Sequence, residues 1–566
     1  MASIQKKVSR GHAYWQIVES RRVDGKPRPI VLAHLGTAER LLQRLQQSPG
    51  TPRKAKVFQF GALAALWEIA QELEVVRIID AQVPKRNQGL SCGQYMLLAA
   101  LNRCVAAGSK ASMYRWYRGT VLQRLLPASK RSLCSQRFWD HMSAIGEEDI
   151  RVIEQQLARQ VIERYRIDVR MLIFDATNFD TFIDSRTLSA LAKRGHAKSK
   201  RKDLRILGLA LLVSCDYHIP LLSHLYPGNQ NDAAMFSSLT EALVSRCKQL
   251  AGECEEITLV FDGGNNSREN IEGLQASAYH FITSLTLTHH ADLLSVPLSR
   301  FSSFSDPRLA GTQAHRTEKE IWESRRTVVI TRSRRLLEGQ IAGINQALRK
   351  KRMALRTLKA KLERSQKPGA RGKGYTRDSL QNHLDSITSG QYVSQILKAQ
   401  ISESQGRLEF RFWTDWSAYE GVKRSRLGKR ILCTDNHQWS TEEIILASRA
   451  QHHVERAFRQ MKNPHWVSFS PAFHWTDQKL RVHAFYCVLA LLLSSLLQRK
   501  AAQGGVKLTI EALLAQLSGV TEVITLFAAP HEGARGRYRA EYVLSERSAV
   551  QDKLCSILGV YEHARS

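Results

Sequence analysis

The sequence lacks the cysteine patterns of disulfide frameworks and of zinc sites. Its 9 cysteines are scattered singly, with no C-x-x-C pair and no cysteine–histidine cluster at the spacing of zinc ligands. Such a distribution favours reduced thiols in a reducing compartment. The composition therefore argues against a secreted fold stapled by disulfides and against a structural zinc site.

Long apolar runs are also missing. The longest, residues 484–497, has 14 residues, whereas a membrane-spanning helix needs about 20. We interpret this run as a buried core helix. The first apolar residues of the chain are isolated among charged ones, so we expect no signal peptide and no membrane partner.

Acidic residues are scarce in relation to basic ones. Asp and Glu together number 52 against 83 Lys and Arg, which gives a formal net charge of +31. A field of this sign attracts polyanions and makes their binding depend on salt. Nucleic acid is the favoured partner, although a ribosome-associated or simply soluble basic protein has the same balance. The 566 residues, 43% of them hydrophobic, can bury several cores, and the length suggests roughly three or four domains.

Two short apolar runs end in the same way. Residues 171–174 are followed by Asp175, and residues 258–261 are followed by Asp262. Runs of this kind are typical of strands covered on both faces, and we expect each aspartate at the carboxyl end of its strand, where open α/β sheets place their ligands. Convergent carboxylates repel each other, and a divalent cation between them relieves the repulsion. A paired-carboxylate metal site on a cationic protein points to phosphodiester chemistry on nucleic acid.

The periodicity of the remaining sequence divides the chain into regions. Residues 1–45 carry short alternating segments that predict a small basic β-meander, and residues 46–54 have the composition of a linker. Residues 57–168 have helical spacing, which predicts a helical domain. Its basic and aromatic residues would suit a domain that binds DNA ends. An ordinary helical bundle explains the aromatic residues of this domain equally well. Residues 501–566 form a C-terminal region.

From residue 169 the pattern becomes α/β. Three strands in succession, followed by strands that alternate with helices, have the order of a ribonuclease H-like sheet. The expected strands cover residues 171–175, 205–214, 219–226, 258–262 and 279–287. One of the alternating helices is expected between residues 233 and 250.

Residues 291–434 interrupt this pattern. They contain a highly basic helix over 332–363, a second helical stretch over 379–402, and strands near 408–413 and 430–433. We interpret the whole segment as an inserted domain.

A further helix is predicted directly after the insertion. Ser440 and Glu443 indicate its capped start, and it continues through Lys462. Glu455, Arg459 and Lys462 share one face because of their i, i+4 and i+7 spacing. Taken alone, this glutamate is best explained by an ordinary amphipathic helix with a surface ion pair.

In combination, these motifs resemble those of the DDE transposases of bacterial insertion sequences, in the group with a long insertion between the second aspartate and the glutamate. The first aspartate ends a strand, as in LIFDATNF with Asp175, and a Pro-Gly-Asn loop follows, as in IPLLSHLYPGN. The second aspartate opens a D-x-G-x-x-S pattern, matched by DGGNNS from Asp262. The glutamate opens E-x-x-F-R-x-x-K, matched by ERAFRQMK from Glu455. The resemblance covers residues 170–290 and 435–500 well and the N-terminal meander more loosely.

The resemblance implies both a fold and an activity. The fold is α/β, with a ribonuclease H-like catalytic core over 169–290 plus 435–500, a large inserted domain, and the β-meander and helical domain before it. The activity is cleavage of transposon ends and joining of the 3′-OH to target DNA. Asp175, Asp262 and Glu455 would be the catalytic residues and would hold two Mg²⁺ ions, for which Mn²⁺ can substitute.

The implied partners are double-stranded DNA, at the terminal inverted repeats and at the target, and a second copy of the chain when DNA ends are bound. We expect DNA contacts from Arg459 and Lys462, beside the catalytic glutamate. We also expect them from His196, Lys198 and Arg201, although a solvated turn between strands is the ordinary explanation for these three. The expected location is the bacterial cytoplasm, in association with the nucleoid.

The sequence departs from the family pattern on the helix of Glu455. Many relatives carry a Tyr seven residues before this glutamate and an Arg four residues before it, both thought to grip DNA phosphates. This chain has Ser448 and Gln451 there. Basic neighbours that are candidates for the missing contact are Arg449, His452 and Arg456.

Two other functional hypotheses stay open at this point. A domesticated or decayed transposase would bind DNA without cutting it; the intact carboxylates argue against this hypothesis, and Ser448 and Gln451 keep it open. An ordinary ribonuclease H-like nuclease, such as a junction resolvase, is disfavoured because such proteins are usually much smaller and lack the long insertion.

Overall fold

The computed structural model describes most of the chain. The residues that it does not describe are 1, 10–11, 24–25, 40–41, 43–51, 84–88, 185, 232–234, 237–238, 240–256, 276–278, 368–373, 405, 528–538 and 566. The chain divides into two compact units, which are Met1–Ile69 with Ser109–Ser135 and Leu497–Ser566, and Ala70–Gly108 with Gln136–Leu496.

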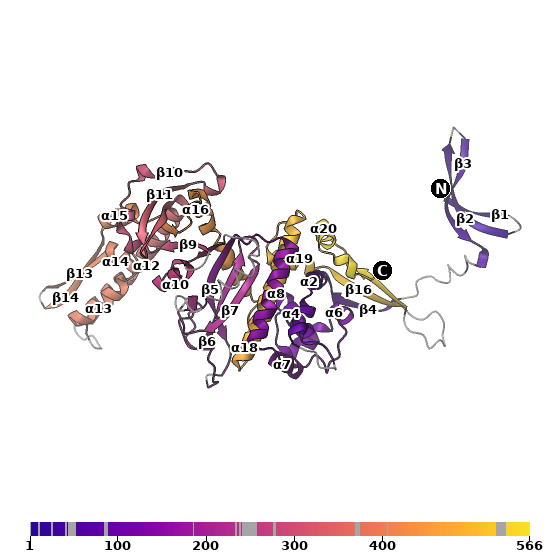
Figure 1. Ribbon diagram of the computed structural model, residues 1–566, viewed down its shortest axis with the longest axis horizontal. Coiled ribbons are helices and arrows are strands. Elements are labelled where there is room, and N and C mark those ends of the chain that lie inside the picture. The colour runs from indigo at the N-terminus through magenta and orange to yellow at the C-terminus, as the bar shows by residue number, and fades with distance from the viewer. Residues whose placement is uncertain are drawn as a thin grey trace. The chain divides into compact units, whose positions relative to one another are not determined.

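The first unit begins with a three-stranded antiparallel sheet. Its strands, β1 (Ala2–Ser9), β2 (His12–Val23) and β3 (Lys26–Gly36), pair in the order β1-β2-β3 (Figure 1). Each strand pairs with the next along the chain, so this sheet is the meander that the alternating sequence predicts.

A second sheet of the first unit joins distant parts of the sequence. Strand β4 (Pro52–Gln59) pairs antiparallel with β16 (Thr521–Phe527), whose other edge carries β17 (Arg539–Leu544). The start of β4 falls in the segment expected as a linker. The local sequence did not predict this strand, because the strand depends on pairing with a partner that lies 462 residues further along the chain (521 − 59). The helices of this unit are α2 (Gly61–Glu72), α5 (Met113–Tyr117), α6 (Leu122–Leu125), α19 (Ile510–Ser518) and α20 (Ala549–Ile557), with short helices η1 (Lys110–Ser112) and η6 (Val560–His563).

The second unit is built on a nine-stranded sheet in the order β10-β11-β12-β15-β9-β8-β5-β6-β7. Its strands are β5 (Met171–Thr181), β6 (Arg205–Ser214), β7 (Pro220–Pro227), β8 (Thr258–Phe261), β9 (His280–Leu285), β10 (Ser302–Ser303), β11 (Thr312–Ile321), β12 (Ser324–Ser333) and β15 (Lys429–Thr434). Strand β5 is antiparallel to β6 and parallel to β8, which is parallel to β9. The part β9-β8-β5-β6-β7 therefore has the ribonuclease H-like order that the sequence predicts.

Strand β5 is longer than expected. It continues to Thr181, so Asp175 lies in its middle rather than at its carboxyl end. The strand continues because residues 176–181 still pair with β6, while pairing with β8 stops at Ile173. Asp175 thus stands just beyond the part of β5 that is covered by strands on both sides.

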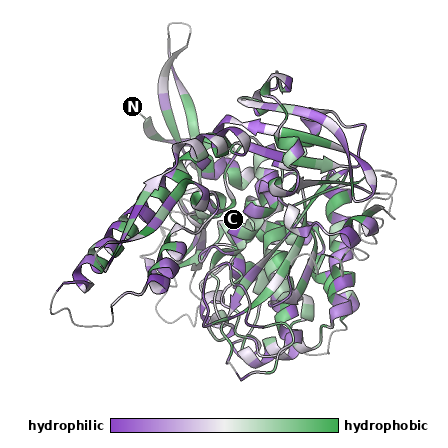
Figure 2. Cartoon of the chain, turned by 90° about the vertical axis from the view of Figure 1, so that its left-hand side faces the viewer, coloured by the Kyte–Doolittle hydropathy of each residue, from purple (hydrophilic) through white to green (hydrophobic). Residues whose placement is uncertain are grey.

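Helices cover this sheet and form the apolar core of the second unit. Helix α8 (Glu147–Tyr165) packs against β7 through a face that buries Ile153, Leu157 and Val161. Helix α18 (Asp477–Gln503) contains the apolar run seen in the sequence, and 94% of its most apolar window is buried. Figure 2 shows the hydropathy of the residues along the helices and strands. The other helices here are α3 (Val75–Gln82), α4 (Cys92–Val105), α7 (Ser135–Ser143), α10 (Arg268–Gln275) and α11 (Ala291–Leu294), with short helices η2 (Gly263–Asn265), η3 (Leu287–His289), η4 (Leu298–Arg300) and η5 (Pro307–Leu309).

Two segments that the sequence predicts to be helical are described differently in the structure. Residues 57–168, expected as one helical domain, contribute helices to both units. In the second unit, α8 packs on the sheet and α3 packs on α8, so these helices belong to the core that surrounds the sheet. The helix expected over residues 233–250 lies outside the described residues, except for 235–236 and 239.

The inserted segment has two parts. Its strands β11, β12 and β15 extend the core sheet, and residues 334–428 form a layer with its own apolar core around Leu355, Leu380 and Phe410. The elements of this layer are α12 (Arg334–Ser365), α13 (Arg377–Thr388), α14 (Val393–Ile396), β13 (Leu397–Ser404), β14 (Arg407–Thr414) and α15 (Trp416–Ser425). The expectation of helix up to residue 402 was wrong from Leu397 onward, because β13 pairs antiparallel with β14 and packs Ile401 against this core.

The helix expected from Ser440 through Lys462 consists of two helices. Helix α16 (Thr441–Arg449) begins with the capping box of Ser440 and Glu443, and α17 (His452–Met461) follows directly. Between them the backbone tightens, and the His453 amide donates to the Ala450 carbonyl three residues earlier at 2.9 Å. This tight turn ends α16 and begins α17.

Candidate active site

Asp175 and Asp262 come from neighbouring parallel strands. In the β5–β8 register Ile173 pairs with Val260, so the same register continued by two residues places the two aspartates at the same level. Neighbouring strands lie about 4.8 Å apart, which brings both carboxyl groups to one edge of the sheet.

Asp262 is held by the turn that follows β8. Its Oδ1 accepts hydrogen bonds from the Gly263 amide at 2.8 Å and from the Ser284 hydroxyl at 3.2 Å. A Cβ on Gly263 would lie 2.5 Å from the Ser284 carbonyl oxygen, whereas a Cβ on Gly264 would meet nothing. The steric need for glycine in DGGNNS therefore lies at Gly263, because β9 passes close to it.

Glu455 is presented by α17. This helix packs against β5 and β6, and it buries Val454, Phe458 and Met461. Glu455 lies on its exposed side. The apolar stripe predicted from the sequence is thus the face that docks α17 on the sheet, and the docking fixes where the glutamate stands.

The three carboxylates line one cavity of about 380 Å³. Asp175 reaches it from β5, Asp262 from the end of β8 and Glu455 from α17. The other lining residues are Ser284, Leu285, Leu287, Leu336, Gln340, Gln391, Tyr392, Lys429, Arg430, Ile431, Ser448, Gln451 and Val454. The structure therefore brings the three residues singled out in the sequence to one polar cavity, although they are separated by up to 280 residues (455 − 175).

The donor chemistry of this cavity fits a hard divalent cation in an open site. Carboxylate oxygens are the preferred ligands of Mg²⁺, which is usually held by one or two carboxylates together with water and substrate phosphates. Across the described residues, no three His, Cys, Asp or Glu side chains are close enough to form a metal-binding group. The carboxylates thus share a cavity without forming a closed ligand cage.

Lys198 and Lys462 flank the strand that carries Asp175. The Lys198 ammonium donates to the Ala176 carbonyl at 2.9 Å, and the Lys462 ammonium donates to the Thr177 hydroxyl at 2.7 Å. Burial and the charge of Lys198 lower the pKa of Lys462, while Asp180 and Asp175 act in the opposite direction. Two cationic groups are therefore fixed next to the first aspartate.

The other basic residues expected to contact DNA have different surroundings. The Arg201 guanidinium pairs with Asp203 at the surface, which raises its pKa. His196 belongs to the same turn and accepts a hydrogen bond at its carbonyl from Asn178 at 3.0 Å. Arg459 is exposed on α17. None of these three lines the described part of the carboxylate cavity.

Ser448 and Gln451 line the cavity together with Glu455. The basic candidates for the missing contact do not line it: Arg449 donates to the Arg308 carbonyl and to the Thr312 hydroxyl, and His452 lines a different cavity. The third candidate, Arg456, lies close enough to His218 and His453 to lower their pKa values.

Several lining residues were not found from the sequence. Ser284 is the penultimate residue of β9, next to β8, and the predicted strand order would have marked that position as part of the same edge. Tyr392 and Arg430 come from the inserted segment, and no local motif connects them to the carboxylates. Only the pairing of β15 with β9 brings Arg430 to this edge.

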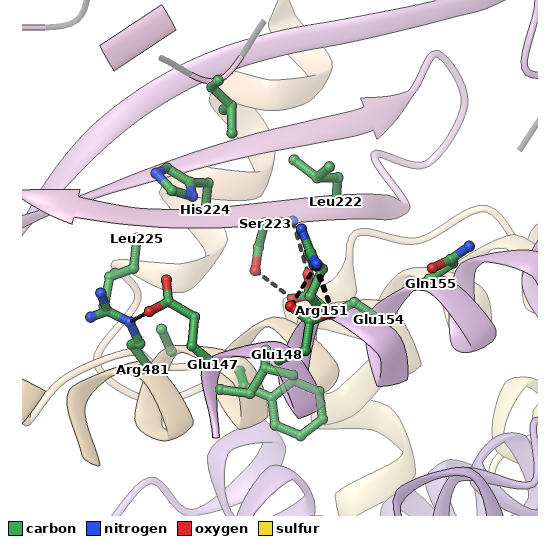
Figure 3. A pocket seen from close by; sticks show the side chains of 14 residues that line it. Glu147, Glu148, Arg151, Glu154, Gln155, Leu222, Ser223, His224, Leu225 and Arg481 are labelled. Atoms are coloured by element: carbon green, nitrogen blue, oxygen red, sulfur yellow. Dashed lines mark hydrogen bonds and ion pairs between the residues drawn. The ribbon is translucent and has the colours of Figure 1, made fainter. Parts of the chain in front are cut away.

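A second cavity, of about 310 Å³, lies between α8, β7 and α18 (Figure 3). Its polar side chains bond to each other. The Ser223 hydroxyl donates to Glu154, and Arg481 pairs with Glu147 at 2.7 Å. The first contact holds α8 on β7, and the second joins α18 to α8. None of the three catalytic candidates lines this cavity.

Comparisons with known proteins give the family. Residues 2–59 match the model of the IS1634 family transposase N-terminal domain, and residues 169–493 match that of the transposase DDE domain. A solved structure, the piggyBac transposase synaptic complex with hairpin DNA, is similar at 9% sequence identity and a TM-score of 0.35, with 82% of each chain covered. No curated protein matches the chain. Because the match to the DDE domain spans more than half of the 566 residues, the chain belongs to the DDE-type transposases of insertion sequences.

Proposed function

We propose that this transposase cleaves DNA at transposon ends and joins the 3′-OH to target DNA by metal-dependent phosphodiester chemistry. The observation that supports the proposal is the convergence of Asp175, Asp262 and Glu455, from three separate elements, on one polar cavity. The net charge of +31 supplies the general attraction for DNA that such a reaction requires.

Asp175, Asp262 and Glu455 would hold two Mg²⁺ ions. When bound, such ions activate a water or a 3′-hydroxyl and stabilise the oxyanion that leaves. The chain itself orients the ligands, because the Gly263 amide and the Ser284 hydroxyl fix the Asp262 carboxylate.

Basic residues around the cavity would hold the DNA backbone. Lys198 and Lys462 are fixed beside Asp175 by their hydrogen bonds to β5, and Arg459 is exposed on α17, one turn beyond Glu455. His196 and Arg201 lie in the charged turn that Asn178 ties to β5. Contacts to phosphates position DNA without reading its sequence.

The test uses a duplex with the terminal inverted repeat that brackets the reading frame. Asp175→Ala, Asp262→Ala and Glu455→Ala should each abolish nicking and leave end binding largely intact, because each removes a ligand and not the cationic surface. Glu163→Gln, an exposed carboxylate on α8, is the matched control and should nick normally. Full nicking by one of the three alanine variants would exclude that residue from the site.

The second candidate function is specific DNA binding without cleavage. The presence of Ser448 and Gln451 in the cavity favours it, because these side chains stand where many relatives carry a tyrosine and an arginine. Specific binding of the end duplex by the unmodified protein, with no nicking in either Mg²⁺ or Mn²⁺, would establish this second function.

We further propose that two copies of the chain assemble on paired DNA ends. Light scattering after size-exclusion chromatography, with and without the end duplex, measures the mass of the complex. A single copy on each duplex at all ratios of protein to DNA would contradict this assembly.

A further inference from the structure

The carboxylate cavity also contains basic and aromatic side chains from the inserted segment. Lys429 and Arg430 open β15, and Tyr392 precedes α14. Strand β15 is antiparallel to β9, so its first residues lie at the same edge of the sheet as Ser284 and Asp262. The insertion therefore forms one wall of the cavity.

Lys429 is already engaged within the protein. Its side chain is buried, and its ammonium donates to the Leu294 carbonyl at 2.9 Å. Burial and the nearby charge of Arg332 lower the pKa of Lys429. This lysine therefore serves to close the wall of the cavity.

Arg430 is in the opposite situation. It is exposed, and no described residue forms a hydrogen bond or an ion pair with its guanidinium. Its charge acts on Arg449, whose pKa is lowered first by burial and then by Arg430. A guanidinium stays charged at all relevant pH values and offers a planar fork of donors that matches phosphate. An anion in the cavity would satisfy this fork.

Tyr392 stands on the same wall. Its backbone has φ 65° and ψ −27°, a left-handed conformation that costs a non-glycine residue roughly 1 kcal/mol or more. The ring packs partly against the apolar core of the inserted segment, and the hydroxyl has no partner among the described residues. The fold therefore holds a tyrosine in a strained position at the cavity.

A second wall of the cavity is formed by the helix pair that carries Glu455. Ser448 and Gln451 line the cavity there with neutral side chains. We propose that Arg430 and Tyr392 bind a DNA phosphate next to the scissile bond, and that they replace from the insertion the two groups that this helical wall lacks. The proposal rests on the function proposed above for the cavity.

Binding of chemically modified DNA tests the phosphate contact directly. Single phosphates of the end duplex are replaced in turn by neutral methylphosphonates, and affinities are measured with the full chain in Ca²⁺. Arg430→Ala should bind the unmodified duplex roughly 10- to 100-fold more weakly, the range for a charge-assisted hydrogen bond. At one position the methylphosphonate should weaken DNA binding by the wild type. At the same position it should not further weaken DNA binding by Arg430→Ala, because that variant has already lost the contact.

The controls separate this contact from a general reduction of charge. Arg411→Ala removes an exposed arginine of β14 that does not line the cavity. Each methylphosphonate should weaken DNA binding by this variant as much as it weakens binding by the wild type. Arg430→Lys keeps the charge without the fork and should give an intermediate reduction in affinity, while Tyr392→Phe removes only the hydroxyl. If each methylphosphonate weakened binding by Arg430→Ala as much as it weakens binding by the wild type, the proposal would be overturned.

A rescue experiment tests the exchange between the two walls. Introducing Gln451→Arg into Arg430→Ala should restore both the affinity and the sensitivity at the same phosphate, because both side chains line one cavity. A double variant no better than Arg430→Ala would contradict the exchange. If the wild type does not nick the end duplex, the proposed function is wrong, but the binding experiment still tests the phosphate contact. If Arg430→Ala nicks and binds normally, only this inference is wrong.

Discussion

Lys462 donates a hydrogen bond from its ammonium to the Thr177 hydroxyl at 2.7 Å, two residues beyond Asp175 on β5. The same ammonium lies 5.3 Å from the centroid of the Phe179 ring. The last residue of the E-x-x-F-R-x-x-K motif is thus fixed against the strand of the first aspartate. This contact ties the glutamate helix to that strand through a charged group.

Replacing this charge should affect DNA handling. Lys462→Met keeps the apolar stem that packs on β5, and it should flatten the salt dependence of end binding by roughly 0.9 in the log–log slope if the lysine neutralises one phosphate. Thr177→Val removes the hydrogen-bond partner and keeps the charge, so its slope should equal that of the wild type. An unchanged slope in Lys462→Met would mean that the lysine only holds α17 on the strand.

Cleavage should require Mg²⁺ or Mn²⁺, and Ca²⁺ should support binding with little cleavage. Calcium tolerates carboxylate ligands, but its longer bonds and looser coordination do not give the geometry for in-line displacement. Nicking of the end duplex is measured in each metal, and gel shifts in Ca²⁺ serve as the binding control. Robust nicking in EDTA would contradict a metal mechanism.

Acid should destabilise the fold through His218. Burial, followed by the charges of His453, Arg456 and His452, lowers the pKa of His218 from 6.5 to about 3. The unfolded chain therefore binds one more proton than the folded chain between these values. The stability linked to His218 is fully present above pH 6.5 and is lost as the pH falls toward 3, by up to roughly 1.4 kcal/mol per pH unit.

Urea unfolding at several pH values measures this dependence. His218→Asn suits the left-handed backbone at this position, where φ is 48°, because asparagine tolerates that conformation. The variant should show a weaker fall of unfolding free energy as the pH drops below 6.5. Equal slopes in both proteins would mean that His218 does not carry the acid sensitivity.

The basic helix α12 should follow the DNA backbone. Lys351 and Arg352 are engaged inside the inserted segment, with Ser389 and Thr414 respectively, so neutralising them would disturb the fold. The exposed residues suited to neutralisation by glutamine are Arg349, Lys350, Arg356 and Lys359.

The quadruple glutamine variant should bind all DNA more weakly, and its log–log salt slope should flatten by roughly 0.9 for each phosphate that is no longer neutralised. Preference for the transposon end over unrelated DNA should survive, because phosphate contacts carry no sequence information. An unchanged slope would indicate that this layer serves assembly between proteins.

Local patterns in the sequence predicted the parts of the site that depend on one element. The apolar runs before Asp175 and Asp262 are β5 and β8, and the stripe around Glu455 docks α17 on the sheet. The extension of β5 beyond Asp175 was missed because it depends on pairing with β6. The tight turn at Ala450 was missed because residues 441–461 keep helical spacing on both sides of it.

Long-range pairing explains the rest of what sequence reasoning could not reach. Arg430 and Tyr392 reach the cavity only because β15 pairs with β9 and because the inserted layer folds over the sheet edge. Neither residue is close in sequence to one of the three carboxylate motifs. The short strand that begins at Leu397 was also missed, because its partner β14 and the apolar core beneath it determine its conformation.

The pairing of β4 with β16 has a consequence for the newly made chain. At roughly 5–20 residues per second, the 461 residues between the two strands (521 − 59 − 1) take roughly 20–90 s to synthesise. Throughout that time β4 has no partner, and an unpaired strand is a template for aggregation. Arg53, Lys54 and Lys56 put three positive charges on this strand, and such charges discourage premature pairing between nascent chains until the last part of the protein emerges from the ribosome.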